Sequence, residues 1–311
     1  MSRQPRTSGY FRTDYAQDFS LLGTRRERLI LAVFVLAVLA FPLIASPFQL
    51  DLACQVFLAS IGALSLMLLT GFAGQISLGH AGLMAAGAFT VGILFRETNA
   101  PFWITLPAAA VVGALLGVIF GLPSLRLRGL YLAVSTLALH FIVIYLFLRY
   151  QLTQFGPAGI SFETATLFGF DITTDKRWYF VLLVVAAVFI VITRNLLKMR
   201  EGRAFIAIRD HEVAAAATGV NPSIVKLKAF AVSSFMVSVA GVLYGYNLGT
   251  ATSESYTLAF TIDFYAMVII GGMGSLLGAV LGAIVWQLLP QVLHTRDLKE
   301  ESSTISTALR Q

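Results

Sequence analysis

The chain has 311 residues, of which 57% are hydrophobic and only 12% charged, and its mean hydropathy is +0.80. Because a soluble domain carries about 25% charged residues, this composition excludes a soluble enzyme, a nucleic-acid-binding protein and a disordered protein. The net charge of +6 then indicates a polytopic membrane protein whose basic residues lie beside anionic lipid.

Apolar runs divide the chain into about eight predicted membrane spans, since each crossing needs about 20 apolar residues. The predicted spans are 28–46, 50–71, 79–95, 102–122, 129–149, 178–194, 226–247 and 263–289. The predicted fold is therefore all-α, with an N-terminal segment 1–27, a transmembrane domain 28–290 and a polar tail 291–311. The number of spans could differ from eight by one or two, because 71–100 and 263–289 are rich in glycine and could be broken or re-entrant.

The distribution of positive charge predicts the orientation. With the N-terminus placed in the cytoplasm, 18 of the 22 lysines and arginines lie on the cytoplasmic side of the predicted spans. The acidic residues divide almost evenly, as expected for a rule that acts on lysine and arginine. Both termini, and the polar segment 195–225, are therefore predicted to be cytoplasmic.

Ionisable residues within the predicted spans are few. Asp51 and Asp263 lie at predicted span starts, where we interpret them as helix caps. His80 and His140 lie deeper, and a lone histidine in such a place is more often a packing residue than a proton relay. The lack of a paired acidic site argues against the hypothesis of an ion-driven transporter. It does not exclude one that binds sodium through backbone carbonyls.

The sequence also lacks the motifs of nucleotide chemistry and of covalent catalysis. It has no Gly-Lys pair, so the phosphate-binding loop is absent, and it has neither a nucleophile elbow nor a zinc-binding histidine pair. The single cysteine, Cys54, excludes an internal disulfide and a cysteine-ligated metal cluster. We therefore predict no catalytic, cofactor or metal site, and a pump built on this chain would draw its energy from another subunit.

Glycines recur at the spacing of helix contacts. Small residues every four positions let two membrane helices approach closely, and this pattern predicts tight helix packing rather than substrate contact. The residues in this pattern are Gly113, Gly117 and Gly121 in one run and Gly274, Gly278 and Gly282 in another.

Two further glycine-rich stretches predict irregular backbone. Gly271, Gly272 and Gly274 fall within four positions and disfavour a continuous helix, so we predict a break there. Such a break at membrane depth must be buried in protein or line a cavity. The stretch 71–82 carries Gln75, Ser77 and His80 between glycines, and is either a buried irregular segment or a wall of the transport pathway. Six residues in these two stretches are candidates for lining the transport pathway: Gln75, Ser77, His80, Gly271, Gly272 and Gly274.

The polar segment 195–225 predicts a short helix from Ala204 to Thr218, ended by a left-handed Gly219 and by Asn221-Pro222. It could be a solvated connector, or its apolar side could dock into a partner.

Four separated blocks of the chain, 71–82, 125–139, 202–212 and 267–282, resemble the LivM permeases. The resemblance covers roughly 28–290 and implies the permease fold of branched-chain amino-acid ABC importers, which lie in the bacterial inner membrane. It also implies a LivH-like sister permease, two cytoplasmic ATPase subunits that bind the ATP, and a periplasmic binding protein. The family generally continues with another apolar segment where this chain has the polar run 294–311.

The same resemblance implies that 203–219 is a coupling helix that docks on the ATPase. Ala214, Ala215 and Gly219 fit the related loop of ABC importers, whereas Val213 stands where glutamate is expected and Glu212 comes one residue early. The implied function is import of leucine, isoleucine and valine, with urea or short amides as an alternative and a stand-alone channel or secondary carrier as a more distant one. The coupling residues implied are Arg203, Arg209, Asp210, Glu212 and Gly219.

Overall fold

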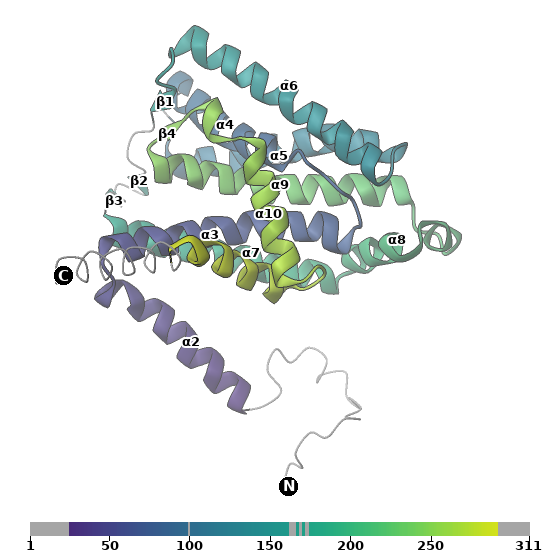
Figure 1. The fold of residues 1–311 in the computed structure, drawn as a ribbon, viewed down its shortest axis with the longest axis horizontal. Helices are drawn as coiled ribbons and strands as arrows, with labels where there is room; N and C mark the ends of the chain where they lie inside the picture. The colour runs from purple at the N-terminus through teal and green to yellow at the C-terminus, as the bar shows by residue number, and fades with distance from the viewer. Residues whose placement is uncertain (1–24, 99, 162–165, 168–169, 172–173, 292–311) are drawn as a thin grey trace, which may run out of the picture. The chain divides into compact units, whose positions relative to one another are not determined.

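The computed structural model describes residues 25–98, 100–161, 166–167, 170–171 and 174–291 (Figure 1). The chain divides into two units, Met1–Phe48 and Gln49–Gln311. The first unit contributes the apolar helix α2, Arg25–Ile44. Most of the predicted N-terminal segment 1–27 and of the tail 291–311 lies outside the described residues.

The second unit is a bundle of helices with a few two-residue strands. Its helices are α3 (Pro47–Leu66), η1 (Met67–Phe72), α4 (His80–Thr98), α5 (Phe102–Gly121), η2 (Leu122–Leu125), α6 (Leu130–Gln154), α7 (Asp175–Lys198), α8 (Arg200–Ala217), α9 (Pro222–Leu248), η3 (Ser253–Ser255), α10 (Leu258–Gly271) and Leu276–Gln291. The strand β1 (Ile160–Ser161) pairs antiparallel with β4 (Thr250–Ala251), and β2 (Thr166–Leu167) pairs antiparallel with β3 (Phe170–Asp171).

The predicted all-α membrane fold is confirmed, whereas the count of eight spans is not. Among the described residues, five helices are long and apolar enough to cross a membrane, or up to six if the bent pair after α9 forms one span. The predicted span 79–95 is the helix α4, whose glycines, alanines and charged end lower its hydropathy. The predicted span 263–289 is the bent pair itself.

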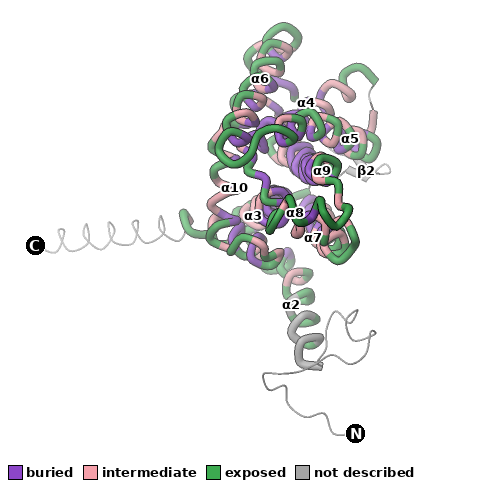
Figure 2. Tube along the Cα trace, turned by 90° about the vertical axis from the view of Figure 1, so that its right-hand side faces the viewer, coloured by how far each residue is buried: buried purple, intermediate pink, exposed green. Residues whose placement is uncertain are grey.

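Helix α9 lies at the centre of the second unit and packs closely on α4 and α5. Figure 2 shows buried residues gathered along α4 and α9, while α6 is largely exposed. Added side-chain carbons at Gly113 and Gly117 of α5 would collide with Ser238 and Ser234 of α9, and one at Gly121 would touch Phe230. The three glycines therefore lie along one contact, where backbones approach because side chains are absent.

This contact predicts graded effects of alanine. We expect Gly117→Ala to destabilise the fold by about 1–3 kcal/mol, because the new methyl group overlaps Ser234 and lies 2.8 Å from the Phe230 carbonyl. Gly121→Ala is the matched control, since its three nearest neighbours are side-chain atoms at 3.0–3.2 Å. Thermal unfolding of the purified protein in lipid nanodiscs compares the two. Equal effects would contradict the assigned packing.

The predicted break at Gly271–Gly274 is present. Helix α10 and Leu276–Gln291 meet at 118°, and Gly272 and Gly274 adopt φ of +92° and +89°, which side chains other than glycine rarely allow. Gly278 lies against the backbone of Gly271, and Gly282 lies against Met267, so the two helices touch through their glycines.

The interpretation of two acidic residues as helix caps is wrong. Helix α10 begins at Leu258 after the N-cap Thr257, which leaves Asp263 in the helix interior. Asp51 lies inside α3, where its Oδ2 accepts a hydrogen bond from Gln55 Nε2 at 2.8 Å. Neither carboxylate is placed to satisfy the free N–H groups of a first turn.

Candidate functional site

Helix α8 connects α7 to α9 and ends as the sequence predicts. Gly219 has φ +87°, its N–H donates to Ala216 O at 3.0 Å, and the Val220 N–H donates to Ala215 O at 3.1 Å. These two bonds satisfy the last carbonyls of the helix. Asn221 Oδ1 then accepts hydrogen bonds from the first N–H groups of α9, which fixes where the next helix begins.

The start of α8 and its straightness differ from the prediction. The helix begins at Arg200 rather than Ala204, because Gly202 lets its first turn lie against the backbone of Leu196 and Leu197 in α7. His211 has φ −159° and ψ +96°, so α8 consists of two helical segments that meet at this residue. Arg209 lies before the kink and Glu212 directly after it.

Arg209 joins the first segment of α8 to the end of the helix formed by α3 and η1. Its Nη1 donates to Gly71 O at 2.8 Å, and its Nε and Nη2 each lie 2.9 Å from Asp210 Oδ1. A guanidinium near the carboxyl end of a helix is stabilised by the helix dipole. The side chain also covers Gly74, where an added Cβ would lie 2.9 Å from Arg209 Cγ.

The two predicted glycine breaks meet beside Arg209. The Gly274 N–H donates to Met67 Sδ at 3.0 Å, and an added Cβ at Gly71 would lie 3.0 Å from Gly274 N. An added Cβ at Gly274 would lie 3.7 Å from Arg209 Nη1. We call Gly71, Gly74 and Gly274, which lie around this guanidinium, the glycine junction.

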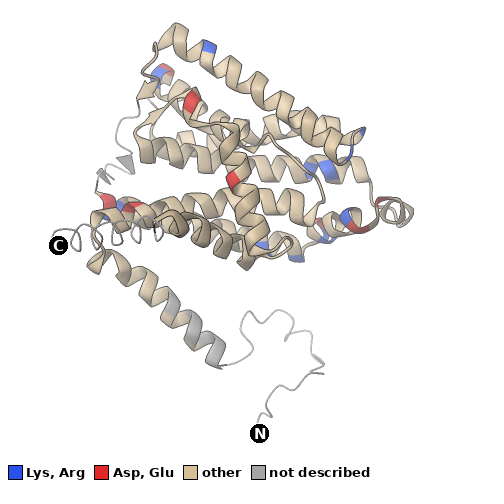
Figure 3. Cartoon of the chain, viewed as in Figure 1, with Lys and Arg blue, Asp and Glu red and all other residues tan. Residues whose placement is uncertain are grey.

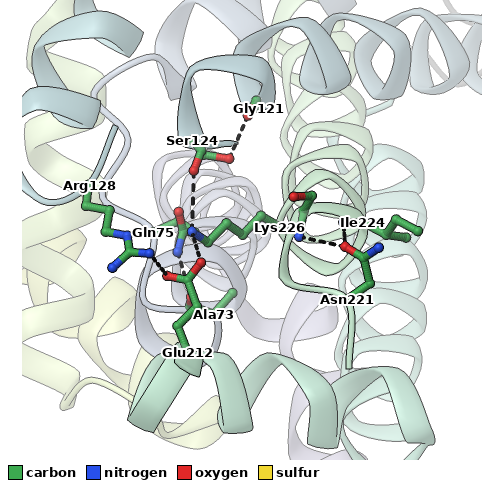
Figure 4. A network of polar contacts seen from close by, with 10 residues as sticks. Ala73, Gln75, Gly121, Ser124, Arg128, Glu212, Asn221, Ile224 and Lys226 are labelled. Carbon is green, nitrogen blue, oxygen red and sulfur yellow. Dashed lines mark hydrogen bonds and ion pairs between the residues drawn. The ribbon is translucent and has the colours of Figure 1, made fainter. Parts of the chain in front are cut away.

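Glu212 joins the second segment of α8 to α9 and to the connection before α6 (Figure 4). Its Oε1 accepts a hydrogen bond from Lys226 Nζ of α9 at 2.7 Å, and its Oε2 lies 3.1 Å from Arg128 Nη2 in the connection before α6. Lys226 Nζ also donates to Ser124 O of η2 at 3.4 Å. Because Lys226 is only 3% exposed, these partners replace the water that would otherwise solvate its ammonium group.

Tyr265 of α10 holds the irregular segment that follows η1. The Ser77 N–H donates to Tyr265 Oη at 3.0 Å, the tyrosine hydroxyl donates to Ser77 O at 3.2 Å, and Thr70 Oγ1 lies 3.3 Å away. Sequence reasoning missed this residue, since nothing marks one tyrosine in an apolar helix as the partner of a distant loop.

The polar pathway candidates are buried in the chain in this conformation. Gln75 Nε2 donates to Ala73 O at 3.2 Å, and Ser77 Oγ accepts the Gly79 N–H at 3.3 Å. His80 Nε2 lies 2.9 Å from Ser233 Oγ. Since that serine hydroxyl donates to Ser65 O at 2.8 Å, it accepts from His80, whose Nε2 therefore carries hydrogen. The imidazole thus joins α3, α4 and α9.

Residues 48–296 match the protein family described as branched-chain amino acid transport system / permease component. The chain belongs to this family. It is 32% identical over 304 residues to the high-affinity branched-chain amino acid transport system permease protein LivM of Salmonella typhimurium, and equally to LivM of Escherichia coli, with 90% of this chain and 71% of each relative covered. It is 25% identical over 297 residues to the autoinducer 2 import system permease protein LsrC of Yersinia enterocolitica, with 90% and 78% covered. No solved structure gives a significant match.

The remaining predicted coupling residues lie on the outer side of the permease's α8. Arg203 is exposed, and its Nη1 donates to Lys198 O at the end of α7 at 2.9 Å. The Asp210 side chain is 60% exposed and Val213 is 70% exposed. Figure 3 shows lysines, arginines and acidic residues gathered around α8, whereas the long helices of the bundle carry few charges.

The permease thus has a short amphipathic helix with two kinds of contact. Arg209 binds the glycine junction, and Glu212 binds Arg128 in the connection before α6 and Lys226 of α9, on either side of the His211 kink. Outward-facing Asp210 and Val213 are accessible.

Proposed function

We propose that this chain is the LivM-like half of an ABC importer that carries branched-chain amino acids across the bacterial inner membrane. A LivH-like sister permease completes the pathway, a periplasmic binding protein delivers the substrate, and two cytoplasmic ATPase subunits supply the energy. The similarity to the two LivM proteins along 90% of the chain supports the substrate class. The lack of a phosphate-binding loop supports an energy source outside this chain.

One observation carries the mechanism: the guanidinium of Arg209 binds Gly71 O and lies beside Gly274. In this proposal α8 docks on an ATPase, and the two glycine breaks act as hinges of the helices that follow them. When the ATPases close and reopen, α8 moves as a lever and Arg209 moves the glycine junction with it. Broken helices that flex about a fixed site are a common basis of alternating access.

Reconstitution tests the energy source. We expect the complete assembly in proteoliposomes to take up leucine only with ATP and binding protein, and the chain alone to show no flux above empty vesicles. Urea and ribose, offered in the same assay, test the other solute classes. Leucine flux through the chain alone would contradict the importer-subunit proposal and support a channel or carrier.

Cross-linking tests the docking surface. In a Cys54→Ala background, which removes the single cysteine, we expect Asp210→Cys and Val213→Cys to form cross-links with a co-expressed ATPase subunit, because both side chains are exposed on α8. The same holds for Arg203→Cys. Leu248→Cys, 46% exposed at the far end of α9, is the matched control and is expected to give none. Cross-linking only at Leu248 would show that the opposite end of the permease, and not α8, faces the ATPase.

A further inference from the structure

Asp263 is an acidic residue inside the otherwise apolar helix α10. Among the described residues its carboxylate has no hydrogen-bond or ion-pair partner, and it is not a helix cap. An aspartate at the centre of a bilayer costs about 2.5–3.5 kcal/mol, and such residues face water-filled cavities or protein rather than lipid. The carboxylate therefore requires a polar environment that the described part of the chain does not supply.

The contacts of α10 place Asp263 at the level of the middle of the neighbouring helix. Its neighbour Phe264 lies against Gly62, ten residues before the end of the Pro47–Phe72 helix, which is about 15 Å along the axis at 1.5 Å per residue. Figure 1 shows α10 crossing the direction of the long helices rather than following it. Asp263 thus lies near the middle of the adjacent span and not at its ends.

The carboxylate lies on the side of α10 that is turned away from its own bundle. Buried Thr261, Phe264, Met267 and Val268 form the packed side, whereas Asp263 is half-buried. Ala259 and Ala266, four residues before it and three after it, share its side of the helix. Ala259 and Ala266 are small, so a group arriving from outside the chain can reach the carboxylate from this flank, whereas Phe260 and Met267 lie on its other flank.

We propose that Asp263 lines the pathway between this chain and its sister permease, and that its carboxylate binds the α-ammonium group of the amino acid in transit. The proposal rests on the proposed function. An ammonium group forms charge-assisted hydrogen bonds to a carboxylate, and an uncharged amide or sugar does not. α10 is also joined to the moving parts, since Tyr265 binds Ser77 and the break that follows α10 lies beside Arg209.

Cysteine labelling tests whether Asp263 meets water. In the complete transporter with Cys54→Ala, we expect Asp263→Cys to react about tenfold faster with a membrane-impermeant, negatively charged methanethiosulfonate than Ile142→Cys does, because a thiolate forms only where water reaches it. Ile142, 54% exposed on α6, is the matched control. Equal, slow reaction at both positions would place Asp263 against lipid or in a closed interface and overturn the proposal.

Removing the charge tests the ammonium contact. We expect Asp263→Asn to lower leucine uptake about tenfold, as loss of a hydrogen bond to a charged group does, and Asp263→Glu to retain most of it. ATP hydrolysis stimulated by the binding protein is expected to persist in Asp263→Asn, which shows that the assembly folds and couples. Unchanged uptake in Asp263→Asn would contradict the proposal. If the wild-type assembly carries no amino acid at all, the proposed function fails, whereas the labelling result still reports where Asp263 lies.

Discussion

Replacing Glu212 by alanine is expected to destabilise the protein by about 3 kcal/mol, because it leaves the charge of Lys226 buried without its carboxylate. The Lys226 side chain is only 4% exposed, and the other acceptor that the described residues offer its Nζ is Ser124 O at 3.4 Å. The same substitution frees Arg128, which is largely exposed and returns to water at little cost. Thermal unfolding in nanodiscs measures the change in stability.

The chain offers a matched control on the same helix. Glu201 pairs with Lys228 at 2.8 Å, but these side chains are 40% and 49% exposed, so Glu201→Ala is expected to cost less than about 1 kcal/mol. The double variant Glu212→Gln with Lys226→Met should recover much of the lost stability, since it removes the unpaired charge as well. Similar losses of stability in Glu201→Ala and Glu212→Ala would show that burial of Lys226 does not make its ion pair with Glu212 more important for stability than the exposed pair.

The apolar runs predicted the helices well because a chain in lipid must satisfy its backbone polar groups within each helix. Hydropathy did not give the number of spans. Helix α4 is the clearest case: its residues from His80 to Gly92 are nearly all buried against other helices, so it needs small residues more than apolar ones. Its place in the bundle depends on contacts such as Gly87 with Ser238 and Gly241 with Met84, which hydropathy does not report.

The polar segment 195–225 was recognisable from its charges, but the partner of each charge was not. Gly71 and Arg209 are separated by 138 positions, and only the folded chain brings them together. The departure at Val213 has a structural counterpart. Glu212 is turned to Lys226, whereas Val213, one position later, is 70% exposed, so a glutamate there would lack this inward partner.

Asp263 shows where reading spans from hydropathy fails. The predicted span began at this residue, which made a helix cap the natural interpretation. The helix in fact begins at Leu258, because Thr257 provides the extended residue before it and Leu258–Ile262 already packs as helix. The helix start was therefore misplaced by about one and a half turns, and this error changed the interpretation of Asp263.

Replacing Arg209 by alanine is expected to lower leucine transport about tenfold or more while the ATPase still binds. The guanidinium supplies a charge-assisted hydrogen bond to Gly71 O, and such bonds contribute about 1.5–3 kcal/mol. Loss of this bond separates α8 from the glycine junction, whereas the outward-facing Val213 stays in place for docking. The number of leucine molecules transported per ATP hydrolysed measures the effect directly.

Arg203→Ala separates coupling from a general loss of positive charge on α8. Arg203 lies on the same helix, and its guanidinium donates to the α7 carbonyl of Lys198 rather than to a glycine break. We therefore expect transport per ATP to stay within about twofold of wild type in this control, as for most exposed substitutions. Arg209→Lys should remain impaired, since a single ammonium cannot bind Gly71 O and Asp210 with the geometry of the guanidinium fork. If both arginine variants lower the transport ratio equally, α8 acts through its charge alone and the link to the glycine junction carries no force.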